Sequence, residues 1–226
     1  MILPVKTLRK KDLEWLGTNK CRHHMTYLSH YQCFLEEKPS TAPFAEKVGY
    51  FDIETTGFYA DYNFMLSYCI LGDDDKLIKN IVTAKEIHKY AFDKRLVSDL
   101  CKDLRGFDRI VVYYGSDYKF DIPFSRTRAI KHGLDFPLYK DILVTDAYAI
   151  VKAKLRMSRR GLLNTCDLFE IPVKEHPGKP NVWMRAAAGK KEDLDYVLIH
   201  NIEDVKSLRD LYHKIIGCVT TGRRSI

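Results

Sequence analysis

The chain has 226 residues, of which 46% are hydrophobic and 30% charged, a composition that excludes a disordered tail and fits one globular domain with or without a small appendage. Its 37 Lys and Arg against 30 Asp and Glu leave a net charge of +7, which favours a polyanionic partner such as nucleic acid. The apolar runs are far shorter than the roughly 20 residues of a membrane span, which argues against a transmembrane protein. The charged N-terminal sequence does not resemble a secretory signal, so we expect the whole chain to be the mature, cytoplasmic protein.

Residues 1–45 are predicted to form a small appendage, polar and irregular apart from a short helical start over 8–16. Its CRHHMTYLSHYQC sequence offers two thiolates and two imidazoles, which suit tetrahedral Zn²⁺ and would add folding energy to a segment with little core. His23 is preferred to His24 because it leaves one residue between ligands. The alternative is a basic surface with incidental cysteines, because the spacing is not that of a common zinc finger. The four candidate zinc ligands are Cys21, His23, His30 and Cys33.

The remaining cysteines are predicted to be free thiols, either buried or incidental. They are thinly spread, and a chain with an ample core does not need disulfide staples. These four residues are Cys69, Cys101, Cys166 and Cys218.

After a linker with two prolines at 37–43, residues 46–226 are predicted to form one α/β domain. Runs rich in β-branched and aromatic residues predict strands at 48–54, 64–71, 76–82, 109–114 and 142–145. Apolar residues at helical spacing predict helices at 93–104, 120–132, 147–155, 162–169 and 191–216. Three prolines predict a loop over 172–183. This order indicates a mixed sheet, an antiparallel meander plus parallel strands, flanked by helices.

Two acidic residues lie on the first strand of this domain. Asp52 and Glu54 are two residues apart, so both side chains point from the same face of the sheet. Unpaired carboxylates are costly on a buried face, and a divalent cation such as Mg²⁺ would hold them. The alternative is an edge strand that exposes this face to water, but the flanking VGYF sequence is typical of a core strand.

Further acidic residues lie at the start of one predicted helix and on the last one. Asp121 follows an apolar strand and either caps its helix or projects into a site at the strand end. His200 and Asp204 are four residues apart and share a helix face, a spacing that is also common in surface contacts. Asp146 is interpreted as a helix cap that can also support the site, and Glu203 as solvent-facing.

The blocks YFDIETTG, FDIPF and HNIEDV occur in the order of the three motifs of the DEDD-superfamily 3′-to-5′ exonucleases, and the chain resembles the branch related to the proofreading domain of family B DNA polymerases. The resemblance covers residues 47–214 and implies an RNase H-like fold. It also implies two Mg²⁺ or Mn²⁺ ions that support hydrolysis of a terminal phosphodiester of DNA, or also of RNA, with release of nucleoside 5′-monophosphates. The metal ligands implied by the motifs are Asp52, Glu54, Asp121 and Asp204.

The predicted general base departs from the family pattern. One DEDD subgroup has a tyrosine four residues before the last aspartate, and another has a histidine five before it. Here a histidine, His200, stands four residues before Asp204. Imidazole can accept a proton at neutral pH, so we expect His200 to be the base, with Tyr196 one turn earlier as the reserve candidate.

Positive charge and aromatic rings near these motifs are expected to bind the substrate. The KAKLRMSRRG tract is a candidate phosphate-binding surface, although such runs are usually solvated faces. The turn after the first strand leaves space for a substrate, and its aromatic residues either stack on the terminal base or pack the loop. The candidate substrate-binding residues are Thr55, Thr56, Gly57, Phe58, Tyr59, Tyr62, Arg126, Arg128, Arg159 and Arg160.

Three functions are consistent with these residues. The first is a metal-dependent 3′-to-5′ exonuclease that binds single strands or 3′ ends of DNA. The second is a catalytically silent nucleic-acid-binding module, which retention of all four carboxylates disfavours. The third is a structure-specific endonuclease on the same fold, which the sequence does not distinguish from the first.

Overall fold

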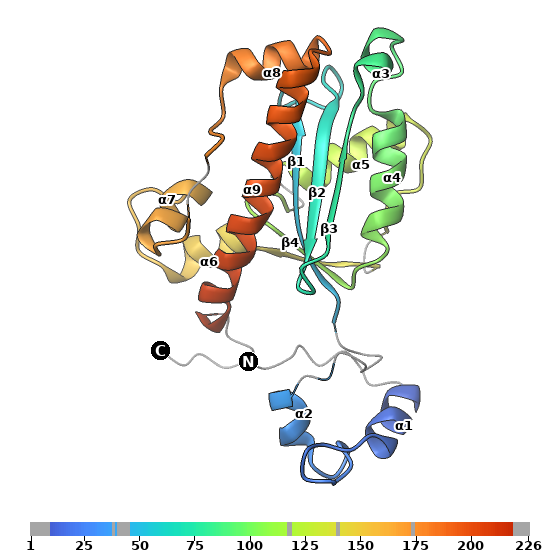
Figure 1. The fold of residues 1–226 in the computed structure, drawn as a ribbon, viewed down its shortest axis with the longest axis vertical. Helices are drawn as coiled ribbons and strands as arrows, with labels where there is room; N and C mark the ends of the chain where they lie inside the picture. Colours follow the sequence, from blue (N-terminus) through green and yellow to red (C-terminus); the bar gives the residue numbers. More distant parts are fainter. Residues whose placement is uncertain are drawn as a thin grey trace. The chain divides into compact units, whose positions relative to one another are not determined.

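The computed structural model describes residues 10–37, 39, 46–116, 119–138, 141–172 and 175–218 (Figure 1). The described residues up to Glu46 belong to one compact unit, and Lys47–Cys218 form a second. Most of the predicted linker at 37–43 lies outside the described residues. No helix in the part of the chain that the structure describes is long and apolar enough to cross a membrane.

The first unit is built around a small core between two short helices, α1 (Lys10–Thr18) and α2 (Tyr31–Glu37). The sequence predicted the first of these helices but not the second. Trp15 stacks on Tyr27 with ring centroids 5.7 Å apart. The buried core consists of Leu16, Cys21, Tyr27, Cys33 and Phe34. Because this core is small, a bound metal would add stability to the unit.

The second unit contains a five-stranded sheet with strand order β3-β2-β1-β4-β5. The three strands of the meander pair antiparallel, whereas β4 and β5 run parallel to β1. The mixed sheet predicted from the sequence is therefore confirmed. The strands are β1 (Val48–Thr55), β2 (Met65–Gly72), β3 (Leu77–Ile81), β4 (Arg109–Val112) and β5 (Leu143–Asp146).

Helices cover both faces of the sheet (Figure 1). Phe51 and Ile53 pack in one core with α4 and α5, whereas Tyr50 packs in a second core with α6, α7 and the C-terminal half of α9. Because side chains alternate along a strand, Asp52 and Glu54 share the face of Tyr50, which is the face that α9 crosses. The helices are α3 (Ala84–His88), α4 (Lys94–Leu104), α5 (Asp121–Lys131), α6 (Ala147–Lys154), α7 (Leu162–Leu168), α8 (Pro180–Ala187) and α9 (Lys191–Ile215), followed by a 3-10 turn at Ile216–Cys218.

Two helices of this unit differ from the prediction. The loop predicted over 172–183 is wrong at its end, because α8 begins at Pro180. A proline is tolerated in the first turn, where its missing N–H has no helical partner to lose. The short helix α3 was also missed, and its start is fixed by a capping box between Thr83 and Glu86.

Candidate active site

Strand β1 brings two carboxylates to the face that α9 covers. Asp52 Oδ2 accepts a hydrogen bond of 3.1 Å from the Asn201 amide of α9. Glu54 Oε2 accepts one of 3.0 Å from the Trp183 indole N–H of α8. The alternative of a water-exposed strand face does not hold, because both acids are only partly exposed and each is bonded to a helix packed over the sheet.

Helix α9 brings the third carboxylate and a histidine to the same place. His200 Nε2 lies 3.4 Å from Glu54 Oε1 and 3.3 Å from Asp204 Oδ2. His200 and Asp204 are buried, with 8% and 6% of their surface exposed, so the pair is not a surface contact. Ligand atoms of Glu54, His200 and Asp204 all lie within 4.8 Å of one another, close enough to share one metal ion.

Asp121 approaches the site from the start of α5. It is the first residue of the helix, and Phe120 rather than Asp121 occupies the capping position. Its buried carboxylate accepts a hydrogen bond from the backbone N–H of Ile53, which stands between the two acids of β1. Burial, together with the negative charges of Asp146 and Asp204, raises the pKa of Asp121 to about 7.

The loop before α5 is shaped to admit the Asp121 carboxylate. A Cβ atom added at Gly115 would lie 2.0 Å from Asp121 Oδ2, so only glycine leaves room for it. Asp146 caps α6 through the Tyr148 N–H and also accepts bonds from the Tyr114 N–H and the Ser116 hydroxyl, at 2.9 and 2.8 Å. Asp146 therefore combines the predicted cap with support for the site.

The donor set fits divalent cations. Carboxylate oxygens from β1, α5 and α9 converge with an imidazole nitrogen, and hard oxygen ligands are those that Mg²⁺ and Mn²⁺ prefer. The raised pKa of Asp121 reflects first its burial and then the negative charges of Asp146 and Asp204, which a bound cation would offset. The residues that would hold the cations are Asp52, Glu54, Asp121 and Asp204.

A segment that the sequence predicted as a loop reaches the site. His200 Nδ1 donates a hydrogen bond to the backbone carbonyl of His176. Glu203 accepts bonds from the backbone N–H of His176 at 3.1 Å and from its Nδ1 at 2.8 Å. The prediction that Glu203 faces solvent is therefore wrong. The hydroxyl of Tyr196, the reserve base, instead donates to the Pro177 carbonyl.

Several contributors were missed by sequence reasoning. Asn201 stands three residues before Asp204, so helical spacing alone places it on the same face and could have marked it. Trp183 and His176 follow prolines in an irregular stretch, and nothing in the local pattern connects them with β1 or α9.

The turn after β1 presents exposed aromatic rings. Thr55 Oγ1 donates to the Gly57 carbonyl, and Thr56 Oγ1 donates to the Asn63 side chain. Phe58 is 82% exposed and contacts Phe120 edge-on at 5.9 Å. Tyr59 and Tyr62 are likewise exposed. A cavity of about 260 Å³ lies here, lined by Phe58, Tyr59, Ala60, Asp61, Lys119, Phe120, Pro123, Phe124 and Thr127.

The structure contradicts the phosphate-binding prediction for one arginine. Arg128 is 2% exposed and forms a buried ion pair with Asp93, at 2.6 and 2.8 Å. His132 Nε2 lies 2.8 Å from the same carboxylate. Burial alone would raise the pKa of Asp93, but hydrogen bonds from Arg128, the Met65 N–H and His132 outweigh it and lower that pKa. Arg128 is thus a core residue that ties α5 to the start of α4.

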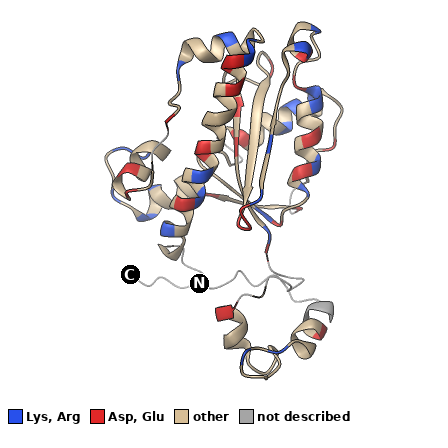
Figure 2. Ribbon diagram, viewed as in Figure 1, with Lys and Arg blue, Asp and Glu red and all other residues tan. Residues whose placement is uncertain are grey.

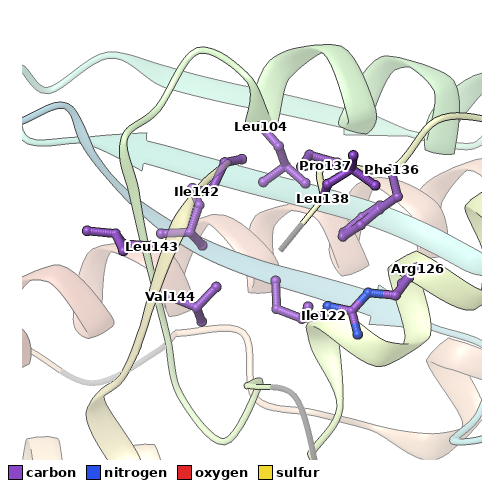
Figure 3. A pocket seen from close by; sticks show the side chains of 10 residues that line it. Leu104, Ile122, Arg126, Phe136, Pro137, Leu138, Ile142, Leu143 and Val144 are labelled. Atoms are coloured by element: carbon purple, nitrogen blue, oxygen red, sulfur yellow. The ribbon is translucent and has the colours of Figure 1, made fainter. Parts of the chain in front are cut away.

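The other predicted arginines are exposed or half-buried. Arg126 stacks over Phe136 and lines an apolar cavity of about 280 Å³ beside β4 and β5 (Figure 3). None of the four predicted metal ligands lines that cavity. Arg159 is exposed and Arg160 half-buried, in the segment between α6 and α7. Basic residues also mark α6 and this segment in Figure 2.

In the first unit, the predicted Cys/His cluster converges on one point. His23 Nδ1 lies 3.1 Å from Cys33 Sγ, and His30 Nδ1 lies 3.4 and 3.3 Å from Cys21 Sγ and Cys33 Sγ. All four ligand atoms are within 4.8 Å of one another. His24, the alternative ligand, is not part of this group.

The electrostatics of the cluster favour a metal-binding thiolate. Burial opposes ionisation of Cys21, but hydrogen bonds with His30 and His23 and with the Met25 backbone lower its pKa to about 6. Burial and the neighbouring Cys21 raise the pKa of Cys33. The chain therefore contains a Cys/His cluster that could hold a metal ion. All six cysteines are free thiols.

A five-stranded mixed sheet with this order, flanked by helices and carrying clustered carboxylates, defines an RNase H-like nuclease fold. A family model described as RNase_H superfamily matches residues 49–216, and the chain belongs to this superfamily.

The structure of a family B DNA polymerase agrees with this fold. The family B DNA polymerase from the hyperthermophilic archaeon Pyrobaculum calidifontis superposes with a TM-score of 0.63 and 15% identity, covering 76% of this chain and 24% of the polymerase. The chain therefore spans about a quarter of the polymerase's length. A structure described as the apo form of the nuclease matches with a TM-score of 0.45 and 15% identity, over 75% of this chain and 73% of its own. No curated protein matches the sequence.

Proposed function

We propose that the chain is a metal-dependent 3′-to-5′ exonuclease that hydrolyses phosphodiester bonds of DNA, or also of RNA. The observation that carries this proposal is the convergence of Glu54, His200 and Asp204 within 4.8 Å, with Asp52 and Asp121 held beside them. Residues 46–226 form the exonuclease domain in this proposal, and residues 1–45 are an appendage. The six free thiols support a cytoplasmic location.

In the proposed hydrolysis, the four carboxylates bind the metal ions and His200 acts as the general base. Two divalent cations, when bound by the four carboxylates, would neutralise the scissile phosphate and activate the attacking water. His200 Nε2 faces the carboxylates and accepts a proton from that water, whose oxygen forms the new bond to phosphorus. The bond from phosphorus to the 3′ oxygen of the preceding nucleotide breaks, and solvent protonates that oxygen. The products are a nucleoside 5′-monophosphate and a shortened strand.

Binding of the terminal nucleotide is assigned to the cavity beside the first motif. Phe58 and Phe120 offer aromatic surface on which any base can stack, and Lys119 offers a positive charge. Thr55, Thr56 and Gly57 bring backbone close to the carboxylates. Arg159 and Arg160 are assigned to the phosphates of the strand that leads into the site.

A direct test uses single strands and duplexes of DNA and RNA labelled at either end, incubated with Mg²⁺ or Mn²⁺. Release of mononucleotides from the 3′ end is expected, with single-stranded DNA degraded fastest and no product after Asp52→Ala. Internal cuts would instead favour a structure-specific endonuclease. Binding without turnover would favour a catalytically silent module.

We further propose that Cys21, His23, His30 and Cys33 bind a structural Zn²⁺. Two thiolates and two imidazoles would supply the four ligands of a closed tetrahedral site, the kind typical of structural zinc. Metal analysis of protein purified without chelator is expected to give one zinc per chain. Absence of zinc above background would contradict this proposal.

A further inference from the structure

The 175–183 segment, which joins the loop after α7 to the first turn of α8, makes three contacts at the carboxylate site. The His176 carbonyl accepts from His200, the His176 side chain pairs with Glu203, and the Trp183 indole donates to Glu54. The Trp183 ring also meets the His200 ring edge-on at a centroid distance of 5.0 Å. The segment therefore touches the two residues, Glu54 and His200, that lie at the centre of the site.

The contact with His176 fixes which nitrogen of His200 faces the carboxylates. A carbonyl oxygen only accepts hydrogen bonds, so His200 Nδ1 carries a proton. The other nitrogen, Nε2, then points at Glu54 Oε1 and Asp204 Oδ2. A ring turned about its χ2 angle would lose the bond to the His176 carbonyl, and Nε2 would no longer point at the carboxylates.

Glu203 holds the carbonyl in place. Its two oxygens accept separately from the backbone N–H and from Nδ1 of His176, at 3.1 and 2.8 Å, and so fix both the backbone and the side chain of that residue. Glu203 lies on α9 three residues after His200, so the carbonyl is tied to the helix that carries the ring it must meet. Hydrogen bonds to a charged carboxylate are stronger than neutral ones, which suits a bracing contact at a loop.

We propose that Glu203 and His176 are positioning residues for His200. Glu203 anchors the His176 backbone, and the His176 carbonyl orients the imidazole so that Nε2 is the atom presented to the reaction. This inference rests on the proposed function, in which His200 accepts the proton of the attacking water. Neither residue contacts the scissile phosphate in this account, and neither is a metal ligand.

The kinetic test compares Glu203→Ala with His200→Ala and with the double variant. Glu203→Ala is expected to lower kcat by about 10- to 100-fold with KM within about two-fold, as is usual when a group that orients a site residue is lost. His176→Ala keeps the backbone carbonyl and one Glu203 bond, so a smaller loss is expected. Asp195→Ala, an exposed acid on the same helix, is the matched control and should leave kcat unchanged.

The double variant shows whether Glu203 acts through His200. If it does, adding Glu203→Ala to His200→Ala costs no further activity, because the residue being positioned is already absent. An equal loss in both backgrounds would overturn the proposal and leave Glu203 with a general structural role. Glu203→Gln keeps the side-chain shape and an acceptor, so it should recover part of the rate.

A second readout does not depend on nuclease activity. In ¹⁵N-labelled protein, the His200 Nδ1–H should give a ring signal protected from exchange, assigned by its loss in His200→Ala. The signal is expected to disappear in Glu203→Ala and to persist in Asp195→Ala. Persistence in Glu203→Ala would refute the positioning role. If the wild-type chain degraded no substrate, this spectrum would still decide whether Glu203 orients the ring, so the two proposals fail separately.

Discussion

The two candidate metal-binding clusters of this chain are assembled in opposite ways. The Cys/His cluster takes all four candidate ligands from residues 21–33, a short stretch that ends in the first turn of α2 and has little core around it. The carboxylate cluster takes its members from β1, α5 and α9, far apart in the sequence, and a large sheet and its helices hold them. In the first case a metal would organise the chain, whereas in the second the fold organises the ligands before any metal arrives.

The sharpest test of this contrast removes one carboxylate. Asp204→Asn is expected to lower nuclease activity by at least about 10³-fold, because a metal ligand is lost. The free energy of unfolding without metal should stay the same or rise, since one of several repelling charges is removed. Activity assays and denaturant unfolding in EDTA measure the two effects. A marked loss of stability would show that the fold depends on this cluster.

The next largest effect on activity is expected from a substitution that crowds Asp121. Gly115→Ala places a methyl group 2.0 Å from the Asp121 carboxylate, so the side chain must move. A displacement of this size is expected to cost about 100-fold in activity and about 1–3 kcal/mol in stability. Steady-state kinetics and thermal unfolding check these values. Gly217→Ala, at a glycine with open space around it, serves as the control.

Removing a ligand from the Cys/His cluster should lower stability and spare activity, the opposite of the result expected for Asp204→Asn. Cys33→Ala is expected to abolish zinc binding and to expose the amides of residues 10–37 to rapid hydrogen exchange, because the metal supplies folding energy to this unit. Nuclease activity should remain within about two-fold, since every proposed catalytic residue lies within Lys47–Cys218. Loss of activity in proportion to zinc would contradict the separation of the two sites.

The smallest effect concerns pH in the absence of metal. The pKa of Asp121 is raised to about 7 in the folded protein, above the ordinary value of about 4 for an unfolded chain. The folded state therefore binds this proton more tightly, and its stabilising effect, complete below about pH 4, is lost as the pH rises through 7. Unfolding in EDTA at pH 5 and pH 8 should show this decline, and Asp121→Asn or added Mg²⁺ should reduce it.

The sequence predicted the sheet and the carboxylates because both leave local patterns. The β-branched run of β1 and the two-residue spacing of Asp52 and Glu54 can be recognised without tertiary structure. The same is true of the compact ligand spacing at residues 21–33.

What the sequence did not predict depends on packing between distant segments. Arg128 lies in a basic stretch, and only the approach of α4 and α5 pairs it with Asp93 in the core. Trp183 and His176 become part of the site only because α8 and the preceding loop fold back over β1 and α9. Glu203 could not be distinguished from a solvated helix residue without the position of His176.

The hydrogen bonds of Asp146 limit the order in which the site can assemble. Its carboxylate binds the Tyr114 N–H and the Ser116 hydroxyl upstream and the Tyr148 N–H downstream, so the loop that shapes the Asp121 pocket is secured only after β5 has paired with β4. His200 and Asp204 are added later still, by the last helix. The proposed hydrolytic centre of a growing chain therefore stays incomplete until α9 has been synthesised and has docked on the sheet.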